Sequence, residues 1–314
     1  MVPAFFSKAM ILFNCDYSEG AHADILRRMA ETNMEQTAGY GEDPYCDQAR
    51  KLIAGLCGRT DLDIHFLIGG TQTNFTVIAA ALRPHQCVLC ADTGHINVHE
   101  SGAVEACGHK VSAIPSPDGK LTARQIEEAW HAHWDDETRE HMPQPRMVYI
   151  SQPTELGTIY SRKELQEISG VCRRRGLYLY MDGARLGYGL CDEDNDLDLP
   201  AISSLCDAFY IGGTKVGALF GEALVLRHEA LKEDFRYIAK QKGGRLAKGR
   251  LLGIQFLELF RDGLYFRLGA HADRLAVMLR DFCRSRGLAL PFSSGTNQQF
   301  VTMPDSVLEE LGRK

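Results

Sequence analysis

Three short segments carry residues that could do chemistry, and each follows an apolar run that predicts a β-strand. Asp182 ends the run LYLYMD, and Arg185 comes three residues later. Lys215 follows AFYIGG and lies among small residues in GGTKVG. Residues 69–71, Gly-Gly-Thr, follow DIHFLI and open an apolar stretch with helical spacing. Because ligands bind at the carboxyl ends of strands in open α/β sheets, we expect these segments to meet in one site.

Each segment alone has an ordinary interpretation. A helix that opens near Thr71 offers free N–H groups and a hydroxyl, which suit a phosphate, but the pattern also fits a glycine turn with a threonine N-cap. Lys215 could form an imine with a carbonyl compound, or could be a solvated loop lysine. Together with Asp182 they form the anchoring set for pyridoxal phosphate (PLP), because a carboxylate keeps the pyridine nitrogen protonated. No P-loop or Gly-x-Gly-x-x-Gly pattern favours a nucleotide instead.

A histidine pair adds a further candidate. His95 and His99 are spaced i, i+4, as metal ligands on a helix can be, but the sequence has no His-Glu-x-x-His order and no evident third ligand. His95 also follows ADTG at the end of a predicted strand. The residues alone therefore leave a metal site, a structural role and stacking on a cofactor ring open, and we predict no metal.

Bulk properties exclude several classes of protein. The 314 residues carry a formal net charge of -6, so there is no basic footprint for nucleic acid. No apolar run reaches the roughly 20 residues of a membrane helix, and MVPAFFSKAMILF at residues 1–13 is too short and poorly flanked for a signal peptide. Most of the ten cysteines lie in apolar stretches, which predicts buried thiols in the reducing cytoplasm. The Cys87-x-x-Cys90 pair is interpreted as part of a strand.

The predicted elements alternate between residues 63 and 227. Strands are expected at residues 63–70, 86–92, 110–115, 146–152, 177–183 and 208–213. Amphipathic helices are expected between them, for example at residues 122–134 and 161–176. This order predicts an α/β fold in three layers, a mainly parallel sheet with helices on both faces. Residues 221–227 follow with too little chain for a helical crossover, so that strand is expected to be antiparallel.

The carboxyl-terminal part has a different pattern. A long helix is expected from residue 246, then a strand at residues 297–303, then the opening of a helix at residues 306–314. We therefore predict a large cofactor-binding domain over residues 1–250 and a small α+β domain over residues 251–314. The pattern breaks off inside the small domain, so we expect the natural chain to continue beyond Lys314.

An ordered series of motifs resembles the low-specificity L-threonine aldolases of the aspartate aminotransferase-like PLP fold. The series runs from FNCDYSEGAHADIL through YGEDPYCDQARKLIAGLCG, GGTQTN, DTGHINVHESGA, MDGARL and GGTKVG to GRLAKGRLLGIQ. The resemblance implies that Gly70 and Thr71 hold the cofactor phosphate, His95 stacks on the ring, Asp182 meets its nitrogen and Lys215 forms the imine. It also implies homodimers or homotetramers with shared active sites.

The same resemblance implies substrate contacts. Arg185 would contact the cofactor's phenolic oxygen or the substrate carboxylate. Tyr40 and the turn at residues 42–44 would lie near the site, reaching it from the same or a neighbouring subunit.

Two departures from the family pattern concern the reaction. The segment QPTELG has Glu155 at or beside the position where the family commonly has a histidine near the substrate hydroxyl. The segment KGGRLAKGR has Ala247 or Lys248 where a carboxylate-binding arginine is expected, so Lys248 becomes a candidate substrate ligand. Either His95 or Glu155 is then available as the general base.

The resemblance implies cleavage of L-threonine or L-allo-threonine to glycine and an aldehyde. A PLP-dependent β-eliminating lyase or an amino-acid racemase would use the same anchoring residues and differ only in the groups that face the substrate. A cofactor-free binding protein of the same fold is the alternative outside enzymes, and the intact Asp182 and Lys215 argue against it.

Overall fold

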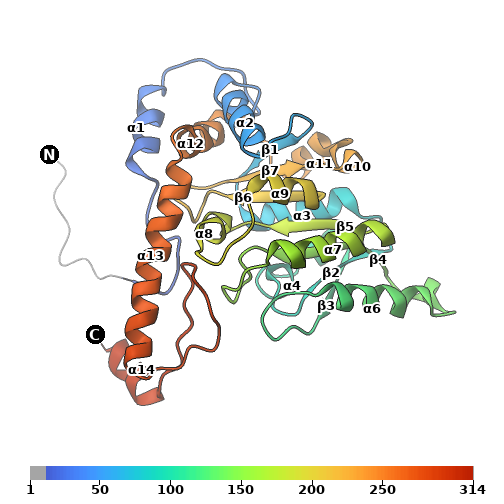
Figure 1. Cartoon of the computed structure of the whole chain (residues 1–314). Coiled ribbons are helices and arrows are strands. Elements are labelled where there is room, and N and C mark those ends of the chain that lie inside the picture. Colours follow the sequence, from blue (N-terminus) through green and yellow to red (C-terminus); the bar gives the residue numbers. More distant parts are fainter. Residues whose placement is uncertain (1–11, 314) are drawn as a thin grey trace.

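The computed structural model describes residues 12–313, in which seven strands form one mixed sheet (Figure 1). The strand order is β1-β7-β6-β5-β4-β2-β3. The strands are β1 (Asp63–Leu67), β2 (Gln86–Ala91), β3 (Lys110–Ile114), β4 (Gln144–Ser151), β5 (Tyr178–Asp182), β6 (Ala208–Gly212) and β7 (Glu222–Leu226). The pairs that connect β6, β5, β4, β2 and β3 are parallel, whereas β7 is antiparallel to both β1 and β6. The mainly parallel sheet and the antiparallel last strand are both confirmed.

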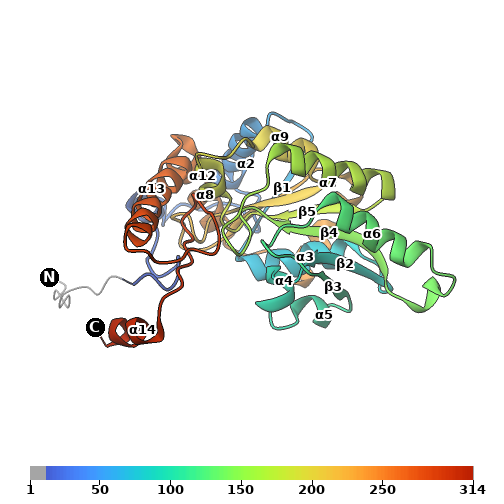
Figure 2. The same ribbon diagram turned by 60° about the horizontal axis from the view of Figure 1, so that its bottom comes forward.

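Helices cover both faces of the sheet. One layer contains α2 (Pro44–Leu56), α6 (Ala123–Trp134), α7 (Arg162–Arg175), α9 (Leu199–Leu205) and α12 (Arg250–Arg261). The other layer contains α3 (Gly70–Ala81), α4 (His95–Val98), α5 (Ala103–Ala106), α10 (Glu229–Lys232) and α11 (Phe235–Gln241). Figure 2 shows α6 and α7 on one side of the sheet and α3, α4 and α5 on the other.

The strands are apolar along their whole length because both of their faces are buried. In β5, Leu179 and Met181 pack into the hydrophobic cluster on the α7 side, and Tyr178 and Tyr180 pack into the cluster on the α3 side. This alternation has the two-residue period of a strand, and it places Asp182 on the α3 side of the sheet at the end of β5.

Local signals explain where the predicted helices begin and end. The side chain of Ser161 accepts a hydrogen bond from the Glu164 amide at the start of α7, and that of Glu164 accepts from the Ser161 amide. The helix ends at Gly176, whose φ of 65° lies in the left-handed region that favours glycine. Thr122 and Gln125 form the same capping box at the start of α6.

The carboxyl-terminal part differs from the prediction. The long helix is divided into α12 and α13 (Leu264–Ser285), with Gly263 between them at φ 68°. The predicted strand at residues 297–303 is wrong: this segment forms a single bridge, between Ala289 and Thr302. A strand needs a paired backbone, and α13 offers none to this segment. The predicted last helix is confirmed as α14 (Asp305–Gly312), beyond the end of α13 (Figure 1).

The division at residue 250 stays a prediction. The helix that begins there, α12, packs against α2 and contributes Leu252, Phe256 and Leu259 to the main hydrophobic core. The remaining elements are α1 (Ala23–Glu31), α8 (Leu186–Cys191) and the 3-10 helix η1 (Arg139–His141).

Two composition-based predictions concern thiols and membranes. All ten cysteines are free thiols, and Cys87 and Cys90 lie buried on β2, as the strand interpretation requires. Within residues 12–313 no helix is long and apolar enough to cross a membrane. Residues 1–11 of the segment considered as a signal peptide lie outside the described residues. Lys314 lies outside them too.

Candidate active site

A cavity of about 250 Å³ opens where the parallel strands end, and it brings together most of the residues singled out in the sequence. Among the residues that line it are Gly70, Thr71, His95, Glu155, Asp182, Arg185 and Lys215. The loops after β1, β2, β4, β5 and β6 each contribute at least one of these side chains or backbone groups, because all five strands end at this edge. Tyr40 and Lys248 do not line this cavity.

Asp182 is held as a carboxylate at the end of β5. One of its oxygens, Oδ2, accepts hydrogen bonds from the Tyr149 hydroxyl at 2.6 Å and the Asn74 amide at 3.0 Å. The other, Oδ1, accepts from the Tyr210 hydroxyl and from the Ala184 backbone N–H. Burial alone would raise the pKa of Asp182, but these four donors together hold it below its usual value. The ionised form therefore depends on the surrounding protein and not on a bound cation alone.

Asn74 links Asp182 to a second buried carboxyl group. Its side-chain amide also donates to Oε1 of Glu100 at 2.7 Å, and the same oxygen lies 2.7 Å from Nδ1 of His95. Burial lowers the pKa of His95, but the hydrogen bond to Glu100 and the charge of Asp182 outweigh it, so the net pKa is raised. The hydrogen bond with Glu100 thereby orients the His95 ring at the wall of the cavity.

The surroundings of His95 bear on the metal alternative. The rings of His95 and His99 have centroids 5.5 Å apart, and Nδ1 of His95 is already paired with Glu100. In the described part of the chain, no three His, Cys, Asp or Glu side chains are arranged so that they could hold a metal ion.

Glu155 is partly buried beside His95. Its Oε1 accepts hydrogen bonds from the Ser151 hydroxyl at 2.7 Å and from the His95 backbone N–H at 2.9 Å. Burial, followed by the nearby charge of Asp182, raises the pKa of Glu155 despite these two donors. A carboxylate with a raised pKa is a stronger base than an ordinary glutamate.

Lys215 follows β6 in a buried turn. Burial and the charge of Arg185 lower the pKa of its ammonium group, which favours the neutral, nucleophilic amine. The turn is held by Glu222, whose carboxyl group accepts from the Gly213 N–H at 3.0 Å and from the Thr214 hydroxyl at 2.8 Å. Burial raises the pKa of Glu222 to about 8.

The Gly-Gly-Thr segment forms the amino end of α3. Gly69 is the N-cap residue and makes no side-chain capping bond, and the helix begins at Gly70. The hydroxyl of Thr71, which is exposed, does not cap the helix, so the ordinary threonine N-cap interpretation does not hold. Free N–H groups at the start of a twelve-residue helix at the cavity wall suit an anion such as phosphate.

Arg185 lies at the start of α8 and is anchored by two distant segments. Its Nε donates to Oδ2 of Asp16 at 2.6 Å and its Nη2 donates to Oδ1 at 3.1 Å. The side chain of Asn297 donates to Oδ2 of the same aspartate at 2.9 Å. Asp16 comes from the segment before α1, and Asn297 comes from the segment after α13.

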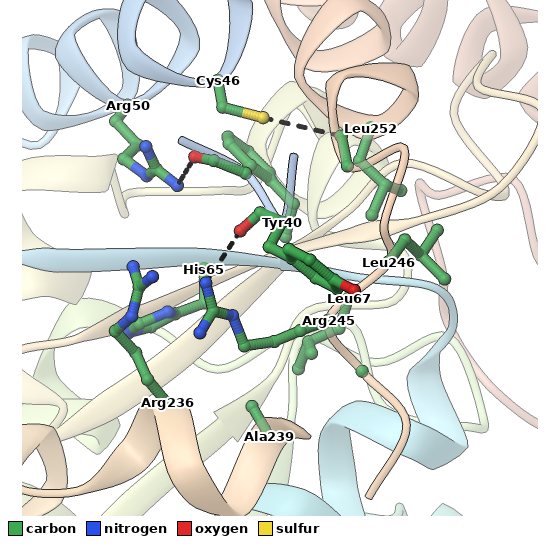
Figure 3. Close-up of a pocket in the computed structure, with 14 residues that line it drawn as sticks. Tyr40, Cys46, Arg50, His65, Leu67, Arg236, Ala239, Arg245, Leu246 and Leu252 are labelled. Carbon is green, nitrogen blue, oxygen red and sulfur yellow. Dashed lines mark hydrogen bonds between the residues drawn. The ribbon is translucent and has the colours of Figure 1, made fainter. Parts of the chain in front are cut away.

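Tyr40 lines a separate pocket together with Arg236 and Arg245 (Figure 3). Its side chain is 46% exposed, and its φ of 59° is in the left-handed region. The ammonium of Lys240 lies 4.3 Å from the centre of its ring, and Arg245 donates to its backbone carbonyl. Lys248 is exposed on the loop that follows.

Several residues of the site were missed by the sequence analysis. Tyr149, Tyr180 and Tyr210 lie on three adjacent strands, where Tyr149 pairs with Tyr180 and Tyr180 pairs with Ala208, and their hydroxyls contact Asp182 or Asn74. The sequence analysis assigned them no role, because only the pairing of the strands shows that their hydroxyls converge. Asn74, four residues into α3, had no signal beyond its place in GGTQTN.

Comparison with known proteins agrees with this geometry. The family model described as beta-eliminating lyase matches residues 15–306. The chain belongs to the beta-eliminating lyase family. This family and the aminotransferases of the same fold are PLP-dependent, so PLP is the cofactor of this chain.

Individual relatives show which members of the family this chain resembles. It is 33% identical to a low specificity L-threonine aldolase of a Pseudomonas strain, over 96% of this chain and 87% of the relative. It is 47% identical to the solved structure of Leishmania major threonine aldolase, with a TM-score of 0.93 over 96% of this chain and 87% of that one. A probable N-succinyldiaminopimelate aminotransferase of Thermus thermophilus, 16% identical with a TM-score of 0.72 over 92% of this chain and 78% of that one, shares the fold alone.

Proposed function

We propose that this protein is a threonine aldolase, which cleaves L-threonine or L-allo-threonine to glycine and acetaldehyde with the help of PLP. The observation that carries the proposal is the meeting of Asp182, Lys215 and the start of α3 in one cavity, which Glu155 also lines. The relatives named threonine aldolases cover nearly the whole chain, which supports the same reaction class.

The cavity residues match the cofactor group by group. Lys215, with its lowered pKa, would bind the aldehyde carbon, and Gly70 and Thr71 would hold the phosphate at the amino end of α3. Asp182 would pair with the ring nitrogen, and that N–H would have to share a carboxylate oxygen with a donor already present. His95, fixed by Glu100, would present its ring face to the pyridine ring.

The chemistry that PLP supplies when bound is to accept the electrons released when a bond at the substrate's α-carbon breaks. The protein must then provide a base for the β-hydroxyl proton. We propose Glu155 for this role, because its pKa is raised and its side chain lines the cavity. The hydrogen bonds from the Ser151 hydroxyl and the His95 N–H both go to Oε1, which leaves Oε2 to take up a proton.

His95 is the second candidate base. Its Nδ1 is engaged by Glu100, and its raised pKa keeps a larger share of the ring protonated near neutral pH, which weakens it as a proton acceptor. We therefore assign it to cofactor stacking and to the backbone N–H that holds Glu155.

Arg185 is the cation placed to bind the substrate carboxylate. It lines the cavity beside Lys215, and a guanidinium group binds a carboxylate with paired hydrogen bonds. Lys248 and Tyr40 lie outside this cavity, so we propose that they reach the active site of a neighbouring subunit in a homodimer or homotetramer. We also propose a cytoplasmic location, which the ten free thiols suit.

An assay that detects both reaction classes tests the proposed function. Purified protein loaded with PLP is given threonine, allo-threonine and phenylserine in an aldehyde-coupled assay, and serine and cysteine in an oxo-acid assay. Aldehyde formation from the β-hydroxy amino acids supports the aldolase. Oxo acid without any aldehyde would falsify it and support a β-eliminating lyase, and exchange of the α-proton without either product would indicate a racemase.

A further inference from the structure

The ion pair between Asp16 and Arg185 joins three parts of the chain at the edge of the cavity. Asp16 precedes α1, Arg185 begins α8, and Asn297 follows α13, so the contact closes over sequence separations of 169 and 281 residues. The Asp16 and Arg185 side chains are only 17% and 18% exposed. A contact with this little exposure is screened by solvent much less than a surface pair.

The geometry of the pair leaves part of the guanidinium group available. Asp16 occupies Nε and Nη2, which is one of the two paired edges of the fork. Over residues 12–313 no hydrogen bond engages Nη1 of Arg185. Arg185 lines the cavity and Asp16 does not, so the carboxylate holds the guanidinium from the side away from the cavity.

The surroundings of Asp16 keep its carboxyl group ionised. Burial alone would raise the pKa of Asp16, but the hydrogen bonds and charge of Arg185, the amide of Asn297 and the charge of Lys215 lower it below its usual value. Asp16 is therefore ionised at neutral pH. It compensates the buried charge of Arg185 and restricts its orientation.

We propose that Asp16 is a positioning residue that orients Arg185 for the α-carboxylate of the amino-acid substrate, and that Asn297 holds Asp16 in place. This inference rests on the proposed function, which supplies a substrate with that carboxylate. A free arginine side chain has many rotamers, and fixing one of them before binding removes an entropic cost of recognition. Asp16 and Asn297, which do not line the cavity, thus act on substrate affinity through Arg185.

Other roles for Asp16 predict different effects on substrate binding. An Asp16 that competed with the substrate for Arg185 would weaken binding, and its neutralisation would tighten it. A purely structural Asp16 would change stability and leave the affinity of the folded protein unaltered.

The experiment compares ligands with and without a carboxylate. Wild-type and Asp16→Asn proteins, both loaded with PLP, are titrated calorimetrically with glycine and with ethanolamine. Ethanolamine has a hydroxymethyl group in place of the carboxylate. We expect the Kd for glycine to rise about tenfold and that for ethanolamine to stay within twofold. The KM for threonine should rise by a similar factor, with kcat within about twofold. Glu19→Gln removes an exposed charge from the same segment and serves as the matched control.

Asn297→Ala provides a second variant if Asp16→Asn does not fold. It removes the amide that holds Asp16 but keeps the ion pair, so we expect a smaller rise, about threefold, in the Kd for glycine alone. Tighter glycine binding, an equal loss for ethanolamine, or unchanged binding in the folded variants would overturn the proposal. A wild-type protein that binds glycine but releases no aldehyde from threonine would contradict the proposed function separately, because the glycine titration would still decide the role of Asp16.

Discussion

The backbone N–H of His95 donates a hydrogen bond to Oε1 of Glu155 at 2.9 Å. The first residue of α4 thereby positions the carboxylate of Glu155. With the Ser151 hydroxyl, this N–H holds Glu155 in a partly buried place where its pKa is raised. The chain at residues 95 and 155 therefore forms one unit, in which the backbone of one residue orients the side chain of the other.

The assignment of Glu155 as the base leads to the first prediction. Glu155→Gln should cut retro-aldol turnover about 10²- to 10⁴-fold, because an amide cannot accept the β-hydroxyl proton. His95→Phe keeps an aromatic face and the backbone N–H, so it should retain most of kcat in the aldehyde-coupled assay. The reverse ranking of the two variants would assign the base to His95.

The same carboxyl group gives a pH dependence. Because burial raises the pKa of Glu155, the basic form that accepts the proton is lost as the pH falls through that raised value. We expect kcat to fall on the acidic side at a higher pH than an ordinary glutamate would produce, and Glu155→Gln should abolish this limb of the profile. A limb that persists unchanged in the variant would belong to another group.

Replacement of Lys215 should remove both bound PLP and activity. Lys215→Ala removes the amine that binds the cofactor aldehyde, so visible absorbance of bound cofactor and turnover should disappear together. Lys163→Ala, an exposed lysine, is the control and should change neither. A variant at residue 215 with the wild-type spectrum would contradict the assignment.

Asp182→Asn should retain measurable cofactor binding and lose turnover by about 10²-fold or more, because a neutral amide does not stabilise the protonated ring nitrogen. Tyr149 donates to Oδ2 and Tyr210 donates to Oδ1, so in the variant one hydroxyl can still donate to the amide oxygen and the other can turn to accept from the amide N–H, and the fold should persist. Near-normal kcat, measured beside a cofactor titration, would mean that another group fixes the ring nitrogen.

The sequence predicted the fold and the main site residues for reasons that are local. The apolar runs from β1 to β7 have strand composition, and the Asp182 and Lys215 positions follow directly from the ends of β5 and β6. The contacts of Asp16 with Arg185 and of Asn74 with Asp182 could not be predicted, because they join segments more than 100 residues apart. The strand expected at residues 297–303 was wrong for a similar reason: alternation describes a segment, whereas a strand also needs a partner.

Mixed oligomers test whether Tyr40 acts in the active site of a neighbouring subunit. If Tyr40 acts in a neighbouring subunit's site, Tyr40→Ala and Lys215→Ala proteins should each be inactive, and a refolded mixture should recover a fraction of the wild-type turnover. Recovery is expected because a mixed dimer has one site with both native residues. Absence of recovery, with mixed oligomers demonstrated by mass, would mean that Tyr40 does not act in a neighbouring subunit's site, and an active Tyr40→Ala protein would place Tyr40 outside the active sites.

The last prediction concerns Asp273 of α13, which is 5% exposed and faces Asp192 at the end of α8, with Tyr188 and Cys191 nearby. Burial, and then the charge of Asp192, raise the pKa of Asp273 to about 8. The folded state therefore binds more protons than the unfolded state between the ordinary aspartate pKa, about 3.9, and about 8. Stability should fall as the pH rises through this window, and Glu222, with a pKa also near 8, adds a contribution of the same sign.

Asp273→Asn should separate the contribution of Asp273 to the pH dependence of stability from that of Glu222. An asparagine carries no charge at any of these pH values, so the variant should have a higher Tm than the wild type at pH 8 and about the same Tm at pH 5. Asp281→Asn, on the exposed part of the same helix, should shift Tm little at either pH. Because Glu222 remains, the variant should keep part of the wild-type decline. A Tm that falls equally in both proteins between pH 5 and pH 8 would show that Asp273 is ionised in the folded state throughout this range.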